Sequence, residues 1–66
     1  MENLIIECVR KYPGLRKRSI AYEIGVPFNS FFLVTLHNLI KNNILKEVDF
    51  KDSANMEFYS KYYVIN

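Results

Sequence analysis

Apolar residues recur at helical spacing along the first two-thirds of the chain and predict three helices. The first is predicted over residues 2–12, and Pro13 and Gly14 end it, because proline lacks an amide hydrogen and glycine adopts the dihedrals of a helix terminus. Its apolar side chains share one face of a 3.6-residue helix: Leu4, Ile5, Cys8, Val9 and Tyr12. The second helix is predicted over residues 17–24 and is closed by Gly25. A brief strand at residues 15–16 can precede it.

The third predicted helix, over residues 28–42, has two faces of different character. One face is expected to point toward the core and carries Phe28, Phe32, Leu36, Leu39, Ile40 and Asn43. The other face is expected to point outward and carries Ser30, Val34, His37 and Lys41, flanked by Phe31, Leu33 and Asn38. Asn43 is expected to end the helix in the left-handed conformation, which asparagine tolerates better than most residues. Ile44 and Leu45 then return to the core.

The last third of the chain alternates with a period of two and predicts a β-hairpin over residues 45–65. In the first strand Val48 and Phe50 alternate with acidic residues. In the second strand the apolar set is Met56, Phe58, Tyr62 and Val64. Residues 52–55 between the strands are turn formers. We expect Tyr59 and Tyr63 to lie on the face of the hairpin opposite to Val48 and Phe50.

Residues 20–45 carry a more specific pattern. Ala21 is a small residue inside a helix and Gly25 follows it by four residues, with apolar neighbours at Ile20, Ile24 and Val26. Residues 36–45, LHNLIKNNIL, match the phrase L-x-x-L-x-x-x-G-[IL]-[IL], except that Asn43 replaces the glycine. Together with the order helix, helix, helix, hairpin, this pattern resembles the winged helix-turn-helix proteins. The turn over residues 26–30 is one residue longer than is common in them.

The resemblance implies an α+β winged helix-turn-helix domain that fills residues 1–66. Proteins of this kind mostly bind duplex DNA, with the third helix in the major groove and the hairpin, or wing, along the backbone or minor groove. Phe31 or Phe32 would anchor that third helix on the core. The expected function is therefore that of a small transcriptional regulator from a prokaryote, a plasmid or a virus.

The charge of the chain is close to balanced but locally basic. Nine Lys and Arg against seven Asp and Glu give a net charge of +2, which excludes a histone-like polycation. Five of the nine basic residues fall within residues 10–18, where no acid stands. Arg16, Lys17 and Arg18 begin the second helix, whose free amide groups add to the attraction for phosphate. We expect these three residues to contact DNA phosphates; a solvated loop that keeps the protein soluble is the alternative.

The outward face of the third helix is the expected base-reading surface. Ser30, His37 and Asn38 can hydrogen-bond to base edges, and Val34 can touch a thymine methyl group. The helix contains no arginine, which predicts recognition that leans toward A·T pairs or depends on DNA shape. A merely solvent-facing side of the helix is the alternative. The full set of DNA-binding candidates is Arg16, Lys17, Arg18, Asn29, Ser30, Val34, His37, Asn38, Lys41 and Lys51.

Two features favour a second hypothesis, a winged-helix module that binds another protein. The wing is slightly negative, which does not suit a surface pressed against phosphate. Ile6 points away from the apolar face of the first helix, and Phe31 and Leu33 flank the outer face of the third, so these side chains are expected to be free for association. A docking face would combine Phe31, Leu33 and Val34 with the tyrosine-rich hairpin. For a DNA-binding protein, a homodimer on two half-sites is the expected assembly.

Little in the sequence suggests catalysis, a metal or a cofactor. His37 is the one histidine and Cys8 the one cysteine, so the usual four zinc ligands cannot come from one chain. Two glycines eleven residues apart make no phosphate-binding loop. We expect no enzyme activity and no cofactor, with Cys8 as a small buried hydrophobe. No apolar run approaches the ~20 residues of a membrane span, and the lone cysteine suits a reducing cytoplasm, on the nucleoid for a DNA-binding protein.

Overall fold

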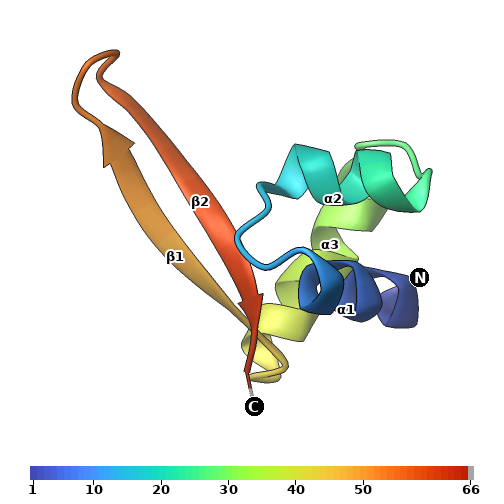
Figure 1. Ribbon diagram of the computed structural model, residues 1–66. Coiled ribbons are helices and arrows are strands. Elements are labelled where there is room, and N and C mark those ends of the chain that lie inside the picture. Colours follow the sequence, from blue (N-terminus) through green and yellow to red (C-terminus); the bar gives the residue numbers. More distant parts are fainter. Residues whose placement is uncertain (66) are drawn as a thin grey trace.

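Three helices are followed by one antiparallel hairpin, in the order that the sequence predicts. The computed structural model describes residues 1–65. Its elements are α1 (Glu2–Lys11), α2 (Lys17–Ile24), α3 (Ser30–Lys41), β1 (Leu45–Asp52) and β2 (Glu57–Val64). The helices pack together, whereas the hairpin leaves them at its base and extends as a long arm (Figure 1). The predicted α+β arrangement of three helices and a two-stranded wing is confirmed. Within residues 1–65, no helix has the length and apolar character needed to cross a membrane.

The helix ends differ from their predicted positions by one or two residues. α1 stops one residue before the predicted end at 12. α3 begins at Ser30 and not at residue 28, because Asn29 caps it: the Asn29 side-chain oxygen accepts a hydrogen bond from the Phe32 amide at 3.1 Å. The predicted helix over 28–42 is therefore too long at both ends, and Phe28 lies in the preceding turn. α2 has the bounds expected of it.

Left-handed residues follow α2 and α3, as predicted. Gly25 has φ 73° and donates its amide hydrogen back to the end of α2. Asn43 has φ 60°, just beyond the C-cap of α3. The Ile44 amide then donates to the Leu39 carbonyl at 2.9 Å, which satisfies an acceptor that the helix leaves open. These two turns direct the chain first into α3 and then into β1.

The core lies where the three helices meet the base of the hairpin. Its buried residues are Ile5, Cys8, Val9, Ile20, Ala21, Phe32, Leu36, Leu39, Leu45 and Tyr62. The predicted outward positions of Ile6 and Leu33 are wrong, because both side chains are partly buried and pack against this core. Leu4, placed inward by the helical pattern, is instead 55% exposed. α1 packs on α2, α3 and β2, and Ile6 is among its side chains that meet this core.

The pairing of the two strands places the tyrosines differently from the prediction. Phe50 pairs with Tyr59, and Lys46 pairs with Tyr63. Directly paired residues project from the same face of an antiparallel sheet, so Tyr59 and Tyr63 share the face of Val48 and Phe50, and the prediction of opposite faces is wrong. The loop over residues 53–56 sets this register, and Met56, with φ 56°, belongs to the loop and not to β2.

Tyr62 joins the hairpin to the helices. Its side chain is 1% exposed. Its backbone exchanges hydrogen bonds with the segment before α2: the Tyr62 amide donates to the Leu15 carbonyl at 3.1 Å, and the Gly14 amide donates to the Tyr62 carbonyl at 2.9 Å. The brief strand expected at residues 15–16 is thus a single bridge between Leu15 and Tyr62. The Tyr62 hydroxyl donates to Glu47 Oε2 at 2.6 Å, across the two strands.

The two left-handed positions give a matched pair of stability tests. Nothing lies within 4 Å of a Cβ added at Gly25, so Gly25→Ala tests backbone strain alone. We expect this change to lower the free energy of unfolding by about 1 kcal/mol. Asn43→Gly relieves the same kind of strain and should leave stability unchanged or raise it by a few tenths of a kcal/mol, roughly. Urea denaturation measures the free energy of unfolding of both variants. Equal losses of stability at the two positions would contradict the view that left-handed backbone strain decides the effect of each substitution.

The Tyr62 hydrogen bond predicts a dependence of stability on alkaline pH. Burial, and then the hydrogen bond to Glu47, raise the pKa of Tyr62 above that of a free tyrosine. The folded protein therefore keeps a proton that the unfolded chain loses above about pH 10. At pH 7, Tyr62→Phe should lower the free energy of unfolding by about 1.5 kcal/mol, because the Glu47 carboxylate then loses its hydrogen-bond donor. This difference between parent and variant should shrink as the pH rises above about 10, and urea titrations at each pH measure it.

Candidate nucleic-acid interface

Three consecutive basic residues stand where the chain enters α2. Arg16 is the N-cap residue, and Lys17 and Arg18 form the first turn. All three side chains are exposed. The bridge between Leu15 and Tyr62 holds this end of α2 against β2, so the basic residues lie beside the hairpin and not on a free loop.

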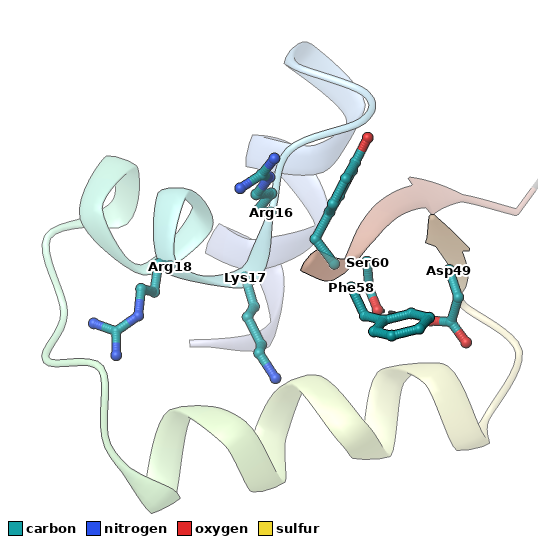
Figure 2. Close-up of a pocket in the computed structure, with 7 residues that line it drawn as sticks. Arg16, Lys17, Arg18, Asp49, Phe58 and Ser60 are labelled. Carbon is teal, nitrogen blue, oxygen red and sulfur yellow. Dashed lines mark hydrogen bonds between the residues drawn. The ribbon is translucent and has the colours of Figure 1, made fainter. Parts of the chain in front are cut away.

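A cleft of about 440 Å³ separates this end of α2 from the hairpin (Figure 2). The residues that line it are Arg16, Lys17, Arg18, Asp49, Phe58, Tyr59 and Ser60. Three cations therefore face one carboxylate, and Asp49 is already engaged by the Ser60 hydroxyl, which donates to Asp49 Oδ1 at 2.7 Å. The cleft carries an excess of positive charge and is open to solvent.

Aromatic rings hold both arginines of this group. The Arg16 guanidinium lies 4.1 Å from the centre of the Tyr59 ring, and Tyr59 stacks on Phe50 with centroids 5.6 Å apart. The Arg18 guanidinium lies 4.4 Å from the centre of the Phe28 ring. A guanidinium that stacks on a ring by its face keeps the N–H groups at its edge available for an anion. Both arginines are thus oriented before any partner arrives.

The three basic side chains diverge rather than converge on one point. Figure 2 shows Lys17 extending toward α3, Arg16 pointing to the opposite side, and Arg18 extending sideways, toward the turn before α3 where Phe28 lies. None of the three forms an ion pair among residues 1–65, where the one pair formed joins Arg10 and Glu7. The arrangement suits an extended polyanion, with several phosphates along its length, better than a single small anion.

The outward face of α3 is exposed, as the sequence predicts. Ser30, His37, Asn38 and Lys41 all have exposed side chains. Val34 is 58% exposed, and its neighbour Phe31 is 67% exposed. Asn29 uses its side-chain oxygen to cap the helix, which leaves its amide group free to donate to a partner. These candidates therefore form one continuous polar and apolar surface along α3.

Three of the four acids of the wing accept side-chain or turn hydrogen bonds within it. Glu47 accepts from Tyr62, and Asp49 accepts from Ser60. Asp52 accepts from the Ala54 amide at 3.0 Å and from Asn55 Nδ2 at 3.1 Å, which fixes the turn. The negative charge that counted against DNA contact by the wing is thus largely explained by the folding of the hairpin. Lys51, the wing candidate, is exposed, and its ammonium lies 5.6 Å from the centre of the Phe58 ring.

Sequence reasoning missed the aromatic residues that orient the arginines. The sequence pattern places Tyr59 on the hairpin face opposite to Val48 and Phe50, and Phe28 on the inner face of a longer helix. No local signal connects Arg16 with Tyr59, which is distant in sequence and comes beside it only through the Leu15–Tyr62 bridge. Phe58 was assigned to the apolar face of the hairpin, but it is 78% exposed beside the cleft.

A metal site or a reactive cysteine would require particular arrangements of the described side chains. Across residues 1–65, no three or more His, Cys, Asp or Glu side chains come together in a way that could hold a metal ion. Cys8 is buried in the core as predicted, and burial raises the pKa of its thiol, with the Glu23 carboxylate adding to the effect. A thiol in that state is a packing group and a poor nucleophile.

Comparison with known proteins identifies the fold. No protein-family model matches the sequence, and no curated protein matches it. Among solved structures, the chain is similar to the PcaV transcriptional regulator from Streptomyces coelicolor, determined in complex with its natural ligand, with a TM-score of 0.78 and 17% sequence identity. The match covers 98% of this chain and 43% of that one, so this chain spans less than half the length of the regulator.

The protein has the winged-helix fold. The similarity extends over nearly the whole chain, and the three helices and the wing stand in the order that the resemblance implied. The predicted winged-helix fold is therefore confirmed. At 17% identity the likeness concerns the path of the backbone, and residue roles have to be argued from this chain.

Proposed function

We propose that this protein binds duplex DNA as a small transcriptional regulator, with α3 in the major groove and the wing along the DNA backbone. One observation carries the proposal: on a winged-helix fold, three exposed basic residues begin α2, and two of them are arginines held on aromatic rings. A bound transcriptional regulator needs such groups, because phosphate contacts supply most of the affinity and position the protein on the duplex.

The rings of Tyr59 and Phe28, the aromatic platforms of the two arginines, favour DNA binding on energetic grounds. Arginine has a long side chain, and fixing it on a phosphate normally costs conformational entropy. Stacking on Tyr59 or Phe28 restricts the guanidinium in advance, so less freedom is lost on binding. Lys17 extends in a different direction from the two arginines, toward α3. The three residues would then contact neighbouring phosphates of one strand.

The remaining candidates divide into two roles under this proposal. Residues that carry hydrogen-bonding or apolar groups into the groove would contact bases: Ser30, Val34, His37 and Asn38. Residues at the margins of the groove would contact phosphates: the Asn29 amide, Lys41 and Lys51. All of these residues are exposed and open to a partner. The one group already in use is the side-chain oxygen of Asn29, which caps α3.

A dimer on two half-sites would fit the small size of the module. One α3 reads only a few base pairs, and twofold-related half-sites add the contacts that one copy lacks. Leu4, 55% exposed on α1, offers apolar surface for such an association. Under the proposal the protein acts in the cytoplasm, on the nucleoid.

The structure removes one residue, Leu33, from the α3 surface to which the hypothesis of protein docking assigned it. Leu33 packs against the core, so of the three residues assigned to the docking face of α3 only Phe31 and Val34 are strongly exposed. A charge at Leu33 would disturb folding as well as docking. A charge at Val34 is therefore the better probe of that surface.

The basic group can be tested by a triple substitution with a matched control. Arg16→Ala, Lys17→Ala and Arg18→Ala together change the net charge from +2 to −1 (+2 − 3 = −1). The control, Arg10→Ala, Lys11→Ala and Lys46→Ala, makes the same change at residues that do not line the cleft. Fluorescence anisotropy of a labelled mixed-sequence duplex, titrated at several salt concentrations, measures both affinity and salt dependence.

We expect the cleft variant to lose at least ten-fold in affinity and about one unit of salt slope for each phosphate contact removed. The control should retain most of both, because net charge alone acts weakly at a distance in salt. Equal losses in the two variants would show that only the overall charge matters. Absence of salt-dependent binding by the parent protein would refute the proposed function.

The platform under Arg16 gives a second test that leaves the charge untouched. Tyr59→Leu removes the ring and should weaken duplex binding about two- to five-fold, the range expected from an exposed cation–π contact. Tyr59→Phe keeps the ring and should bind like the parent. Anisotropy at low salt measures both variants, with thermal unfolding as a check of folding. If the two variants bind alike, Tyr59 does not position Arg16.

A further inference from the structure

Two large apolar side chains project from the first half of α3 into solvent. Phe31 is 67% exposed and Val34 is 58% exposed. They are three residues apart and therefore neighbours on one side of the helix. Both are separate from the buried face, which Phe32, Leu36 and Leu39 form. Packing of the core does not require apolar residues at either position, so a partner is the natural explanation for them.

The surroundings of this pair are polar but almost uncharged. Lys41, in the last turn, is the one charged residue in α3. The Thr35 hydroxyl donates to the Phe31 carbonyl at 2.9 Å, so Thr35 can offer a partner its methyl group and an acceptor oxygen but no donor. Asn38 is exposed and lies two turns beyond Phe31, on the same side. The surface thus combines the apolar side chains of Phe31 and Val34 with a methyl group and the uncharged polar groups of Ser30, His37 and Asn38.

The chemistry of base-pair edges identifies what such a surface would recognise. In the major groove, thymine alone carries an apolar group, its 5-methyl, and adenine presents the donor and acceptor that a carboxamide pairs with. Guanine is read best by arginine or lysine, and cytosine by a carboxylate. The first three turns of α3 contain none of these three groups. The residues near the start of a recognition helix are also those that reach base edges.

We infer that Phe31 and Val34 read the 5-methyl groups of neighbouring thymines, and that Asn38 pairs with an adenine beside them. This inference rests on the proposed DNA binding and specifies how the same surface selects its sequence. Phe31, which the sequence-based candidates for DNA contact omitted, becomes the principal specificity residue. The site recognised would contain consecutive A·T pairs whose thymine methyl groups line one wall of the major groove.

The test removes the methyl groups and nothing else. A duplex is first selected for tight binding from a random 20-base-pair library. Each thymine of this duplex is then replaced in turn by deoxyuridine, which keeps every hydrogen-bonding group and lacks only the 5-methyl. We expect the selected duplex to be rich in A·T pairs, and replacement of one or two particular thymines to weaken binding about four-fold each, the value of one buried methyl group.

Variants assign the effect to the two side chains. Phe31→Ala and Val34→Ala should each bind the thymine duplex more weakly and should each be insensitive to deoxyuridine at one position. The slope of affinity against salt should be unchanged in both, because no phosphate contact is lost. Tyr22→Ala removes an exposed aromatic side chain from α2, a residue with no place in the proposed DNA contacts, and serves as the control, with no effect on deoxyuridine sensitivity. Circular dichroism confirms that each variant is folded.

The outcomes separate this inference from the proposed function. Steep salt dependence without any penalty for deoxyuridine, or an equal penalty in the parent and both α3 variants, would overturn methyl reading and leave DNA binding standing. Selection of G·C-rich duplexes would overturn it as well. Failure of the parent to bind any duplex would remove the proposed function and the inference together. In that case Phe31 and Val34 would serve a protein partner.

Discussion

The attachment of the wing to the helices depends on the buried Tyr62. Its ring fills the base of the core, its backbone is bonded to Leu15 and Gly14, and its hydroxyl binds Glu47 on the opposite strand. Burying the ring is favourable, and burying the hydroxyl is tolerable because it has an acceptor. Since Leu15 directly precedes Arg16, the same bonds that hold the wing also place the start of α2 beside it. The cleft exists because of this junction.

Some side chains of the wing stabilise the hairpin, and others support the proposed DNA-binding surface. The carboxylates of Glu47, Asp49 and Asp52 accept hydrogen bonds within the hairpin and stabilise a two-stranded sheet that would be marginal on its own. Tyr59 stacks on Phe50 and supports Arg16. A wing with nearly balanced charge can therefore belong to a DNA-binding surface, because three of its four acids stabilise the hairpin and the Tyr59 ring supports a neighbouring arginine.

The inner and outer faces of α3 obey different constraints. Phe32, Leu36 and Leu39 must be apolar, because they close the core against α1 and the base of the hairpin. Residues on the other face are free of that requirement, so their identities carry information about the partner. Phe31 and Val34 are informative for this reason: an exposed apolar pair brings no stability to the isolated protein. The fold that this chain shares with a distant regulator accounts for the inner face alone.

The sequence by itself determined the elements whose signals are local. Helical periodicity, Gly25 after α2 and Asn43 after α3 act within a few residues, so three helices, their turns and the following hairpin were predictable. Its helical pattern also placed Ser30, His37 and Asn38 outward. Only the tertiary structure decided which face of the hairpin carries Tyr59, because strand register depends on the conformation of the loop and shifts every side chain when it slips by one residue. The tertiary structure also decided that Ile6 and Leu33 pack inward and that Arg16 stacks on Tyr59. These contacts join segments that are far apart in the chain, and such segments are brought together by packing and not by local conformational preference.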